Sequence, residues 1–167
     1  LPLVLKPVSE GSSLGVSLIK SGEGFAAILA KAVADFKDVF IEEYVKGREV
    51  TVGVIGTGKD LQALPILELV PKKEFYDFEA KYNDPKTSYL VPAPIDARLF
   101  MRAEELGVAA HRALGCRSLS RVDMILDEHG RLYGLEVNTI PGMTERSLLP
   151  KAAKAAEKII LKTKGEK

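Results

Sequence analysis

The chain has 167 residues, of which 46% are hydrophobic, and 24 Lys and Arg against 23 Asp and Glu leave a net charge of +1. This composition supports a hydrophobic core and excludes global disorder, and the balanced charge gives no electrostatic footprint for nucleic acid. No apolar run approaches the roughly 20 residues that span a bilayer. The single cysteine, Cys116, cannot form an internal disulfide, which fits a reducing cytoplasm. The chain opens on Leu1 in what reads as the middle of a strand, so an N-terminal part is expected to be missing.

Hydrophobic patterning predicts a mixture of hairpins and helices in chain order, which is typical of the α+β class. The first part is expected to hold strands at 3–6, 16–19 and 39–43 and a helix over 25–36. The middle is expected to hold strands at 49–55 and 61–70 around a turn at 56–60, and then an irregular, proline-rich loop over 71–95. The last part is expected to hold a helix over 97–114, a hairpin of strands 120–127 and 132–137, and a helix over 149–161.

The hairpin around His129-Gly130 carries the most informative polar pattern. If it closes symmetrically, Asp127 faces Leu132 and Asp123 faces Glu136, with Asn138 two residues beyond on the same face. Opposed carboxylates in a sheet repel each other, whereas a hard divalent cation reverses the sign of that interaction. The oxygens of Asp, Glu and Asn suit Mg²⁺ and leave room for phosphate. The alternative is a solvated polar face on an amphipathic hairpin.

Val122, Met124, Leu135 and Val137 are expected on the opposite, core-facing side of this hairpin. The strand ends at Pro141-Gly142, which no strand or helix favours. This break in the backbone favours the metal site over the solvated face, because it indicates a loop that holds substrate.

Three further stretches are compatible with a bound nucleotide. The Gly/Ser segment 10–15 follows a strand, where backbone N–H groups and Lys6 could reach an anion, although a plain turn is the alternative. Residues 40–49, FIEEYVKGRE, could supply an apolar slot and an acceptor for a ribose, or form an exposed edge strand. Residues 75–82, FYDFEAKY, are expected to form either a lid over a phosphate or a small apolar cluster under the loop.

These segments together resemble the D-alanine–D-alanine ligase family of ATP-grasp enzymes. The resemblance rests on KPVSEGSSLGV, FIEEYVKGRE, FYDFEAKY and SRVDMILDEHGRLYGLEVNTIPGMTERSLLP, in this order, and covers residues 2 to about 157. It implies an ATP-grasp fold with a mostly antiparallel sheet and flanking helices. It also implies that ATP phosphorylates one D-alanine and that the amine of a second D-alanine displaces the phosphate, for peptidoglycan synthesis in the cytoplasm.

The resemblance implies a role for individual residues. Two Mg²⁺ ions, or Mn²⁺, would be held by Asp123 and Glu136 and by Glu136 and Asn138. The nucleotide would contact Lys6, Glu42, Glu43, Val45, Glu49, Phe75 and Lys81. The reacting groups would meet Arg121, Lys81, Ser12, Tyr82 and the Gly142 backbone N–H, with Ser147 and Leu148 at the second D-alanine. Tyr82 also argues against the relatives that make a D-lactate ester.

The resemblance implies a domain division and leaves other functions open. Residues 1–48 would be the end of the ATP-grasp small subdomain and residues 49–167 the large C-terminal domain. The absent upstream half would supply the site for the first D-alanine, and the full-length enzyme would be a homodimer that needs neither nucleic acid nor a membrane. The alternatives are a nucleotide-binding module without turnover and another ATP-grasp carboxylate–amine ligase.

Overall fold

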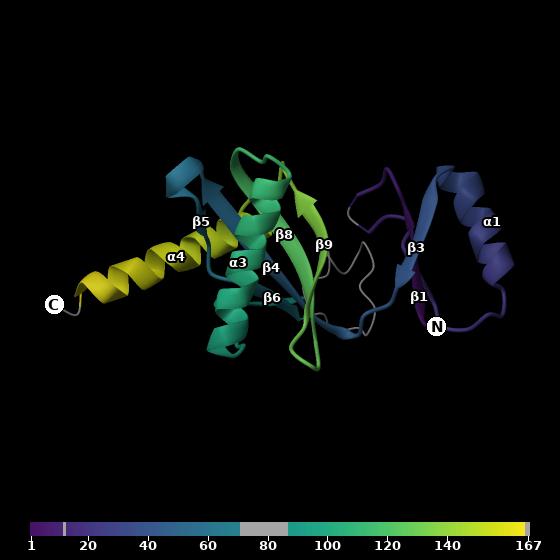
Figure 1. The fold of residues 1–167 in the computed structure, drawn as a ribbon, viewed down its shortest axis with the longest axis horizontal. Coiled ribbons are helices and arrows are strands. Elements are labelled where there is room, and N and C mark those ends of the chain that lie inside the picture. Colours follow the sequence, from purple (N-terminus) through teal and green to yellow (C-terminus); the bar gives the residue numbers. More distant parts are fainter. Residues whose placement is uncertain (12, 71–86, 166–167) are drawn as a thin grey trace. The chain divides into compact units, whose positions relative to one another are not determined.

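The computed structural model describes residues 1–11, 13–70 and 87–165. The chain divides into two compact units, one formed by Leu1–Val45 and the other by Lys46–Val70 together with the chain from Ser88 onward (Figure 1). The division falls close to the expected position after residue 48. That the two units are the small and large ATP-grasp domains stays a prediction.

The first unit is a three-stranded antiparallel sheet with one helix. Strands β1 (Leu3–Pro7), β2 (Ser17–Ile19) and β3 (Val39–Glu43) pair in the order β2-β1-β3. Helix α1 (Phe25–Phe36) has the predicted bounds and packs Ala32, Phe25 and Leu29 against Leu5 and Ile19 of the sheet. One sheet face is therefore covered by the helix, and the other carries Lys6 and Glu42.

The second unit is built around a six-stranded sheet, with the order β7-β6-β4-β8-β9 and β5 paired to β4. Its long central strands are β4 (Gly47–Gly56) and β8 (Ser118–Asp127), which pair antiparallel over their full lengths. The other strands are β5 (Gln62–Ala63), β6 (Leu67–Val70), β7 (Ser88–Leu90) and β9 (Leu132–Asn138). Every pairing is antiparallel, as the sequence predicts.

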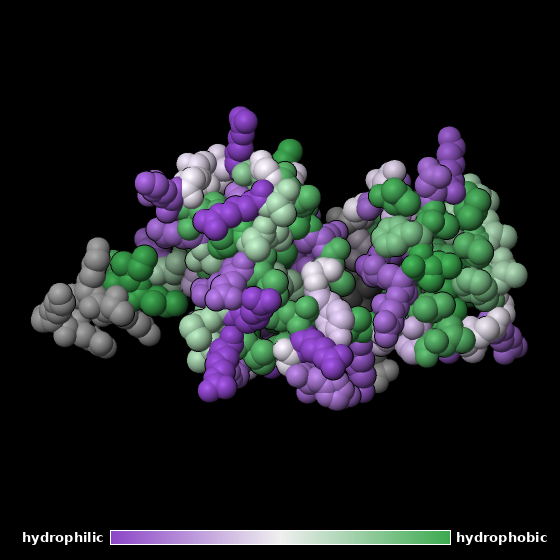
Figure 2. Space-filling model, viewed as in Figure 1, coloured by the Kyte–Doolittle hydropathy of each residue, from purple (hydrophilic) through white to green (hydrophobic). Residues whose placement is uncertain are grey.

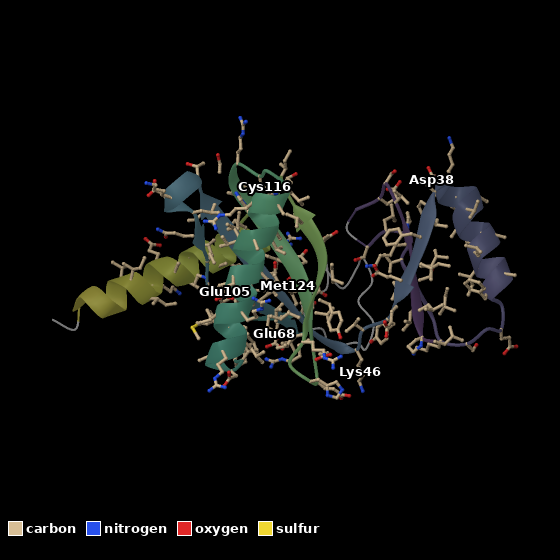
Figure 3. The ribbon with its side chains drawn as sticks, in the orientation of Figure 1. Asp38, Lys46, Glu68, Glu105, Cys116 and Met124 are labelled. Atoms are coloured by element: carbon tan, nitrogen blue, oxygen red, sulfur yellow. The ribbon has the colours of Figure 1, made fainter. Side chains whose placement is uncertain are left out.

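Helices cover both faces of this sheet. Helix α3 (Ala97–Ala113) begins at Asp96, whose carboxylate accepts from the Arg98 N–H, and ends just before Gly115, which has a left-handed φ of 61°. It crosses the face on which Val50, Val52, Val54, Val122 and Met124 form the main core (Figures 1 and 3). Helix α4 (Leu148–Gly165) packs Leu149 and Ala152 against Leu64 on the opposite face. A Cβ on Gly53 would lie 2.5 Å from Leu149 Cδ1, so the absence of a side chain at Gly53 leaves the space that Leu149 of α4 fills.

Two expectations for the middle of the chain are corrected. The single strand expected over 61–70 is two strands, β5 and β6, with Pro65 in the gap, where it has no N–H to give to a ladder. Strand β7, within the expected loop 71–95, pairs with β6 at the edge of the sheet. Residues 71–86 of that loop lie outside the described residues.

The register of the β8–β9 hairpin differs from the symmetric expectation near the turn. Leu132 faces Leu126 rather than Asp127, because the Asp127 N–H donates to the Arg131 carbonyl oxygen and leaves three residues, 128–130, in the loop, with Gly130 in the left-handed region at a φ of 78°. A β-bulge then inserts Leu135 between Gly134, which faces Met124, and Glu136, which faces Asp123. The predicted pairing of Asp123 with Glu136 is therefore confirmed. The expectation that Leu135 faces the core is wrong, because its side chain is 38% exposed.

The surface leaves several apolar side chains open to solvent. They include Ile28 and Val33 of α1 and Ile159, Ile160 and Leu161 near the end of α4, where Figure 2 shows green atoms. None of the described helices has the length and apolar content needed to cross a membrane. Cys116 is a half-buried free thiol after α3 (Figure 3).

Candidate functional site

The polar face of the second unit is formed by alternate residues of three adjacent strands. In β4 and β8, Thr51 faces Asp123 directly. In β8 and β9, Asp123 faces Glu136 and Arg121 faces Asn138. Because side chains alternate along a strand, these residues share the face opposite the α3 core. The structure thus brings together the three predicted metal ligands and the predicted oxyanion-stabilising arginine.

Asp123 is the buried centre of this face, with 1% of its surface exposed. Arg121 binds it with two bonds, Nε to Oδ1 at 2.8 Å and Nη2 to Oδ2 at 2.7 Å. Thr51 Oγ1 lies 2.5 Å from Oδ1 of the same carboxylate. A buried carboxylate needs this compensation, since an isolated charge in a low-dielectric interior is strongly disfavoured. The Arg121 side chain is itself only 6% exposed, so the ion pair is shielded from water.

Asn138 joins the two acids at the rim of the face. Its Nδ2 lies 3.2 Å from Asp123 Oδ2 and 3.1 Å from Glu136 Oε1. One small amide group within hydrogen-bond reach of both carboxylates shows that oxygens from Asp123 and Glu136 surround a common point. Glu136 is exposed and Asn138 half-buried, so this point is open to a ligand from solvent.

This donor set fits a hard divalent cation. Two carboxylates and one amide offer the oxygen ligands that Mg²⁺ takes, and the amide can rotate its oxygen inward because its two ends are nearly the same size. Among the described residues, no group of three His, Cys, Asp or Glu side chains forms a metal site by itself. The face therefore suits an ion whose remaining ligands come from phosphate and water.

The loop after β9 folds back on itself at Ser147. The Ser147 Oγ accepts from the Thr144 N–H at 3.1 Å and contacts the Thr144 hydroxyl at 2.9 Å. A Cβ on Gly142 would lie 2.8 Å from that Oγ, so Gly142, which was predicted to stabilise the oxyanion, and Ser147, which was predicted to contact the second D-alanine, are neighbours. Leu148, the other predicted contact of the second D-alanine, is 8% exposed, which leaves its backbone as the group that could meet a substrate.

Lys151 holds this loop from the first turn of α4. Its ammonium group binds the Arg146 carbonyl, lies 3.4 Å from the Glu145 carbonyl and sits 4.7 Å from the centre of the Tyr89 ring. Partial burial, together with the charge of Arg146, lowers the pKa of Lys151. The backbone at 145–146 is therefore tied to both α4 and β7.

The predicted nucleotide contacts divide between the two units. In the first unit, Lys6 forms an ion pair with Glu42 on the sheet face away from α1. Glu43 follows Glu42 in β3, so its side chain points to the opposite face and is exposed. A ligand on the Lys6 face would meet the side chain of Glu42 and not that of Glu43. Val45 lies beyond β3 and is half-buried.

Glu49 belongs to the second unit and lies in β4 on the same face as Thr51, facing Leu69 and Ile125. Four other predicted residues, Ser12, Phe75, Lys81 and Tyr82, lie outside the described residues. Their expected roles in phosphate binding, adenine packing and a lid stay predictions.

Sequence reasoning missed two polar side chains at this site, Thr51 and Lys151. A threonine among the valines of β4 is an ordinary strand residue, and only its pairing with Asp123 gives it significance. Lys151 belongs to a lysine-rich helix and is distinguished only by its contacts. In the sequence, Thr51 is notable only as a polar residue in an otherwise apolar strand. Lys151 has no signal in the sequence.

Comparisons with known proteins show the family of the chain. The family model described as the D-ala D-ala ligase C-terminus matches residues 1–158. The D-alanine–D-alanine ligase of Geotalea uraniireducens is 46% identical over 93% of this chain and 49% of its own length. That of Geobacter sulfurreducens is 47% identical over 91% of this chain and 47% of its own length. The chain thus spans about half the length of the curated relatives it matches.

Solved structures give the same result. The D-alanine–D-alanine ligase of Bacillus anthracis superposes with a TM-score of 0.76 at 38% identity, over 94% of this chain and 49% of that one. The VanG D-Ala:D-Ser ligase of Enterococcus faecalis superposes with a TM-score of 0.78 at 34% identity, over 93% of this chain and 45% of that one. The α+β architecture is the ATP-grasp fold of these enzymes. The match to the family model, the sequence identity to the relatives and the shared fold agree. The chain therefore belongs to the D-alanine–D-alanine ligase family, whose C-terminal part it represents.

Proposed function

We propose that this chain is the ATP- and metal-binding half of an enzyme that joins two D-alanines for peptidoglycan synthesis. The observation that carries the proposal is the convergence of Asp123, Glu136 and Asn138 across β8 and β9, with Arg121 buried beside them. An oxygen face of this kind suits a nucleotide triphosphate held through divalent cations. A Bacillus anthracis relative at 36% identity has been solved in complex with ATP, which supports ATP as the nucleotide.

The proposed reaction has two steps. A carboxylate oxygen of the first D-alanine attacks the γ-phosphorus of ATP, which releases ADP and leaves a D-alanyl phosphate. The amine of the second D-alanine then attacks the acyl carbon, inorganic phosphate leaves with the bonding electrons of the C–O bond, and the nitrogen loses a proton. In such phosphoryl transfers the protein contributes mainly positioning and charge compensation.

Each part of the site has a proposed task in these steps. Asp123, Glu136 and Asn138 would hold Mg²⁺, or Mn²⁺ in its place, and these ions would neutralise the transferring phosphoryl group. Arg121 and the Gly142 N–H would stabilise the oxyanion formed as the amine attacks. Ser147 and the Leu148 backbone would orient the second D-alanine. Lys6 and Glu42 would contact the nucleotide from the first unit.

The proposal includes a region that this chain does not contain. An N-terminal half would supply the site of the first D-alanine, and the full-length enzyme would be a dimer in the cytoplasm. The length of the relatives supports the first point, because the chain matches about half of each. Turnover is therefore tested in a full-length ligase that carries this C-terminal half.

Glu136→Gln tests the metal assignment in that full-length form. Replacing a carboxylate ligand by a neutral amide should abolish phosphate release in the presence of ATP, Mg²⁺ and D-alanine, and should weaken Mn²⁺ binding measured by electron paramagnetic resonance. Glu128→Gln is the matched control, because Glu128 is an exposed carboxylate in the turn of the same hairpin. Unchanged phosphate release by Glu136→Gln would remove the metal assignment.

A second carboxylate–amine ligase activity is favoured by one comparison. A D-Ala:D-Ser ligase superposes on this chain at 34% identity, so the acceptor could be D-serine rather than D-alanine. The mass of the product formed from ATP and D-alanine, with and without an excess of D-serine or D-lactate, distinguishes these acceptors. Binding of ATP without release of phosphate with any acceptor would favour a nucleotide-binding module instead.

A further inference from the structure

Thr51 places a hydroxyl against the buried side of the proposed metal face. It lies in β4 between Leu67 of β6 and Asp123 of β8, with 2% of its surface exposed. Buried hydroxyls in folded proteins are nearly always hydrogen-bonded. Valine would fill this position equally well, so the contribution that is specific to threonine is the hydrogen bond of its hydroxyl.

The hydroxyl donates to Asp123. Thr51 Oγ1 lies 2.5 Å from Asp123 Oδ1 and 3.2 Å from the Val122 carbonyl oxygen. A hydroxyl has one proton, and hydrogen bonds to a carboxylate are the shorter and stronger of the two kinds. The proton therefore belongs to the Asp123 contact, and the Val122 contact is secondary.

This bond distinguishes the two oxygens of Asp123. Oδ1 accepts from Thr51 and from Arg121 Nε, both within the protein interior. Oδ2 accepts from Arg121 Nη2 and is the oxygen that Asn138 reaches, on the side of Glu136. A carboxylate turns easily about its last torsion, which is broad and roughly two-fold. A donor fixed on the neighbouring strand resists that rotation.

We propose that Thr51 is a positioning residue for the metal site: it holds Asp123 Oδ1 so that Oδ2 faces the metal together with Glu136 and Asn138. Arg121 bonds to both oxygens of Asp123 from the same strand, whereas Thr51 bonds to Oδ1 alone and does so from the neighbouring strand β4. Thr51 donates from a branched, stiff side chain on the central strand of the sheet. The inference rests on the proposed function, since it assigns a role within the same metal face.

The test separates the hydroxyl from the shape of the residue. Thr51→Val removes the hydroxyl and keeps the volume, and Thr51→Ser keeps the hydroxyl. Mn²⁺ binding in the presence of ADP is measured by electron paramagnetic resonance in the full-length ligase, alongside thermal unfolding. Partners that orient metal ligands typically change metal affinity by about 10–100-fold when mutated, and Thr51→Val should fall in that range while Thr51→Ser stays near wild type.

The outcomes distinguish this inference from the proposed function. If Thr51→Val weakens Mn²⁺ binding and Thr51→Ser does not, the positioning role is supported. If Thr51 acted only through packing, Thr51→Val, which keeps the volume, would be the milder of the two changes. Wild-type Mn²⁺ affinity in Thr51→Val, with binding lost in Glu136→Gln, overturns the positioning role and leaves the metal face intact. Wild-type affinity in both variants overturns the metal face itself. If Thr51→Val does not fold, Thr51→Ala compared with Thr51→Ser gives the same contrast, and equal affinity in that pair overturns the role.

Discussion

Arg121 neutralises a buried acid, so its removal should destabilise the second unit even where no catalysis is measured. In Arg121→Met, Asp123 stays 99% buried and loses two hydrogen bonds of 2.7 and 2.8 Å to a side chain that is itself only 6% exposed. Breaking a buried pair by removing one partner costs about 3–5 kcal/mol. Thr51 and Asn138 still donate to the carboxylate, which places the expected loss near 3 kcal/mol, the lower end of that range.

The structure supplies a matched control in a second bidentate pair. Arg48 binds Glu68 with Nε at 2.7 Å and Nη2 at 2.5 Å, and contacts the Pro94 carbonyl, but its side chain is 42% exposed (Glu68 is labelled in Figure 3). Water can replace much of what Arg48→Met removes. Glu68 is itself only 6% exposed, so the expected loss is about 1–2 kcal/mol, above that of an exposed pair but below that of Arg121→Met, because water can reach the position that the Arg48 guanidinium leaves.

Thermal unfolding followed by circular dichroism measures both losses. In a domain of 150–250 residues each kcal/mol shifts Tm by about 2–4 °C, so Arg121→Met should lower Tm by roughly 10 °C and Arg48→Met by a few degrees. Hydrogen exchange in β8 peptides assigns the loss to the second unit. In addition, Mg²⁺ with ADP should restore part of the stability of Arg121→Met, because a bound cation adds binding free energy to the folded state. An Arg121→Met shift no larger than that of Arg48→Met would refute the view that Asp123 depends on its buried partner.

Two further predictions concern packing and pH. Gly53→Ala places a methyl group 2.5 Å from Leu149 Cδ1, so α4 must shift or Leu149 must change rotamer. We expect the free energy of unfolding in urea to fall by about 1–3 kcal/mol and the KM for the second amino acid to rise. An unchanged stability would contradict the close approach. Bonds from the Arg131 and His129 N–H groups and the Tyr133 hydroxyl, led by that of Arg131, lower the pKa of Asp127 below its usual 3.8. A lowered folded-state pKa gives stability that is present above pH 3.8 and is lost as the pH falls through the folded value. The stability difference between wild type and Asp127→Asn, measured from urea unfolding at pH 2–6, should therefore be constant above about pH 5 and shrink below pH 3.8; a difference that is the same at every pH would contradict the assignment.

Local pattern was sufficient for most of the elements. The bounds of α1 were predicted to the residue, since apolar residues recur at helical spacing from Phe25 to Phe36 and glycines precede the first turn. The break at Pro65 was missed because the apolar run continues through it and only the absent N–H marks the interruption. Strand β7 was missed because its three residues at a sheet edge depend on pairing with β6, a tertiary contact.

The pairing of Asp123 with Glu136 was predicted correctly, whereas the register near the turn of the hairpin was not. The symmetric register was wrong at Leu132, yet Asp123 and Glu136 do face each other. A three-residue loop displaces the pairing by one position, and the extra Leu135 restores it. Neither irregularity is visible in the alternation of polar and apolar residues, so the correct pairing followed from two cancelling departures. The contacts of Thr51 and Lys151 are long-range and lie beyond any local pattern.

Because of the bulge at Leu135, the direction in which Glu136 points depends on the number of residues between the turn and Glu136. It depends much less on which residues these are. Were one residue inserted between Gly130 and Glu136, with the loop and the bulge otherwise kept, Glu136 would face Val122, on the side filled by the hydrophobic core, whereas loss of one residue would remove the bulge and leave Glu136 opposite Asp123. The exposed side chain of Leu135 could vary widely at little cost, because it joins no cluster of the core. An insertion in this short segment would therefore turn a ligand inward, whereas a single deletion and most substitutions there would leave it where it is.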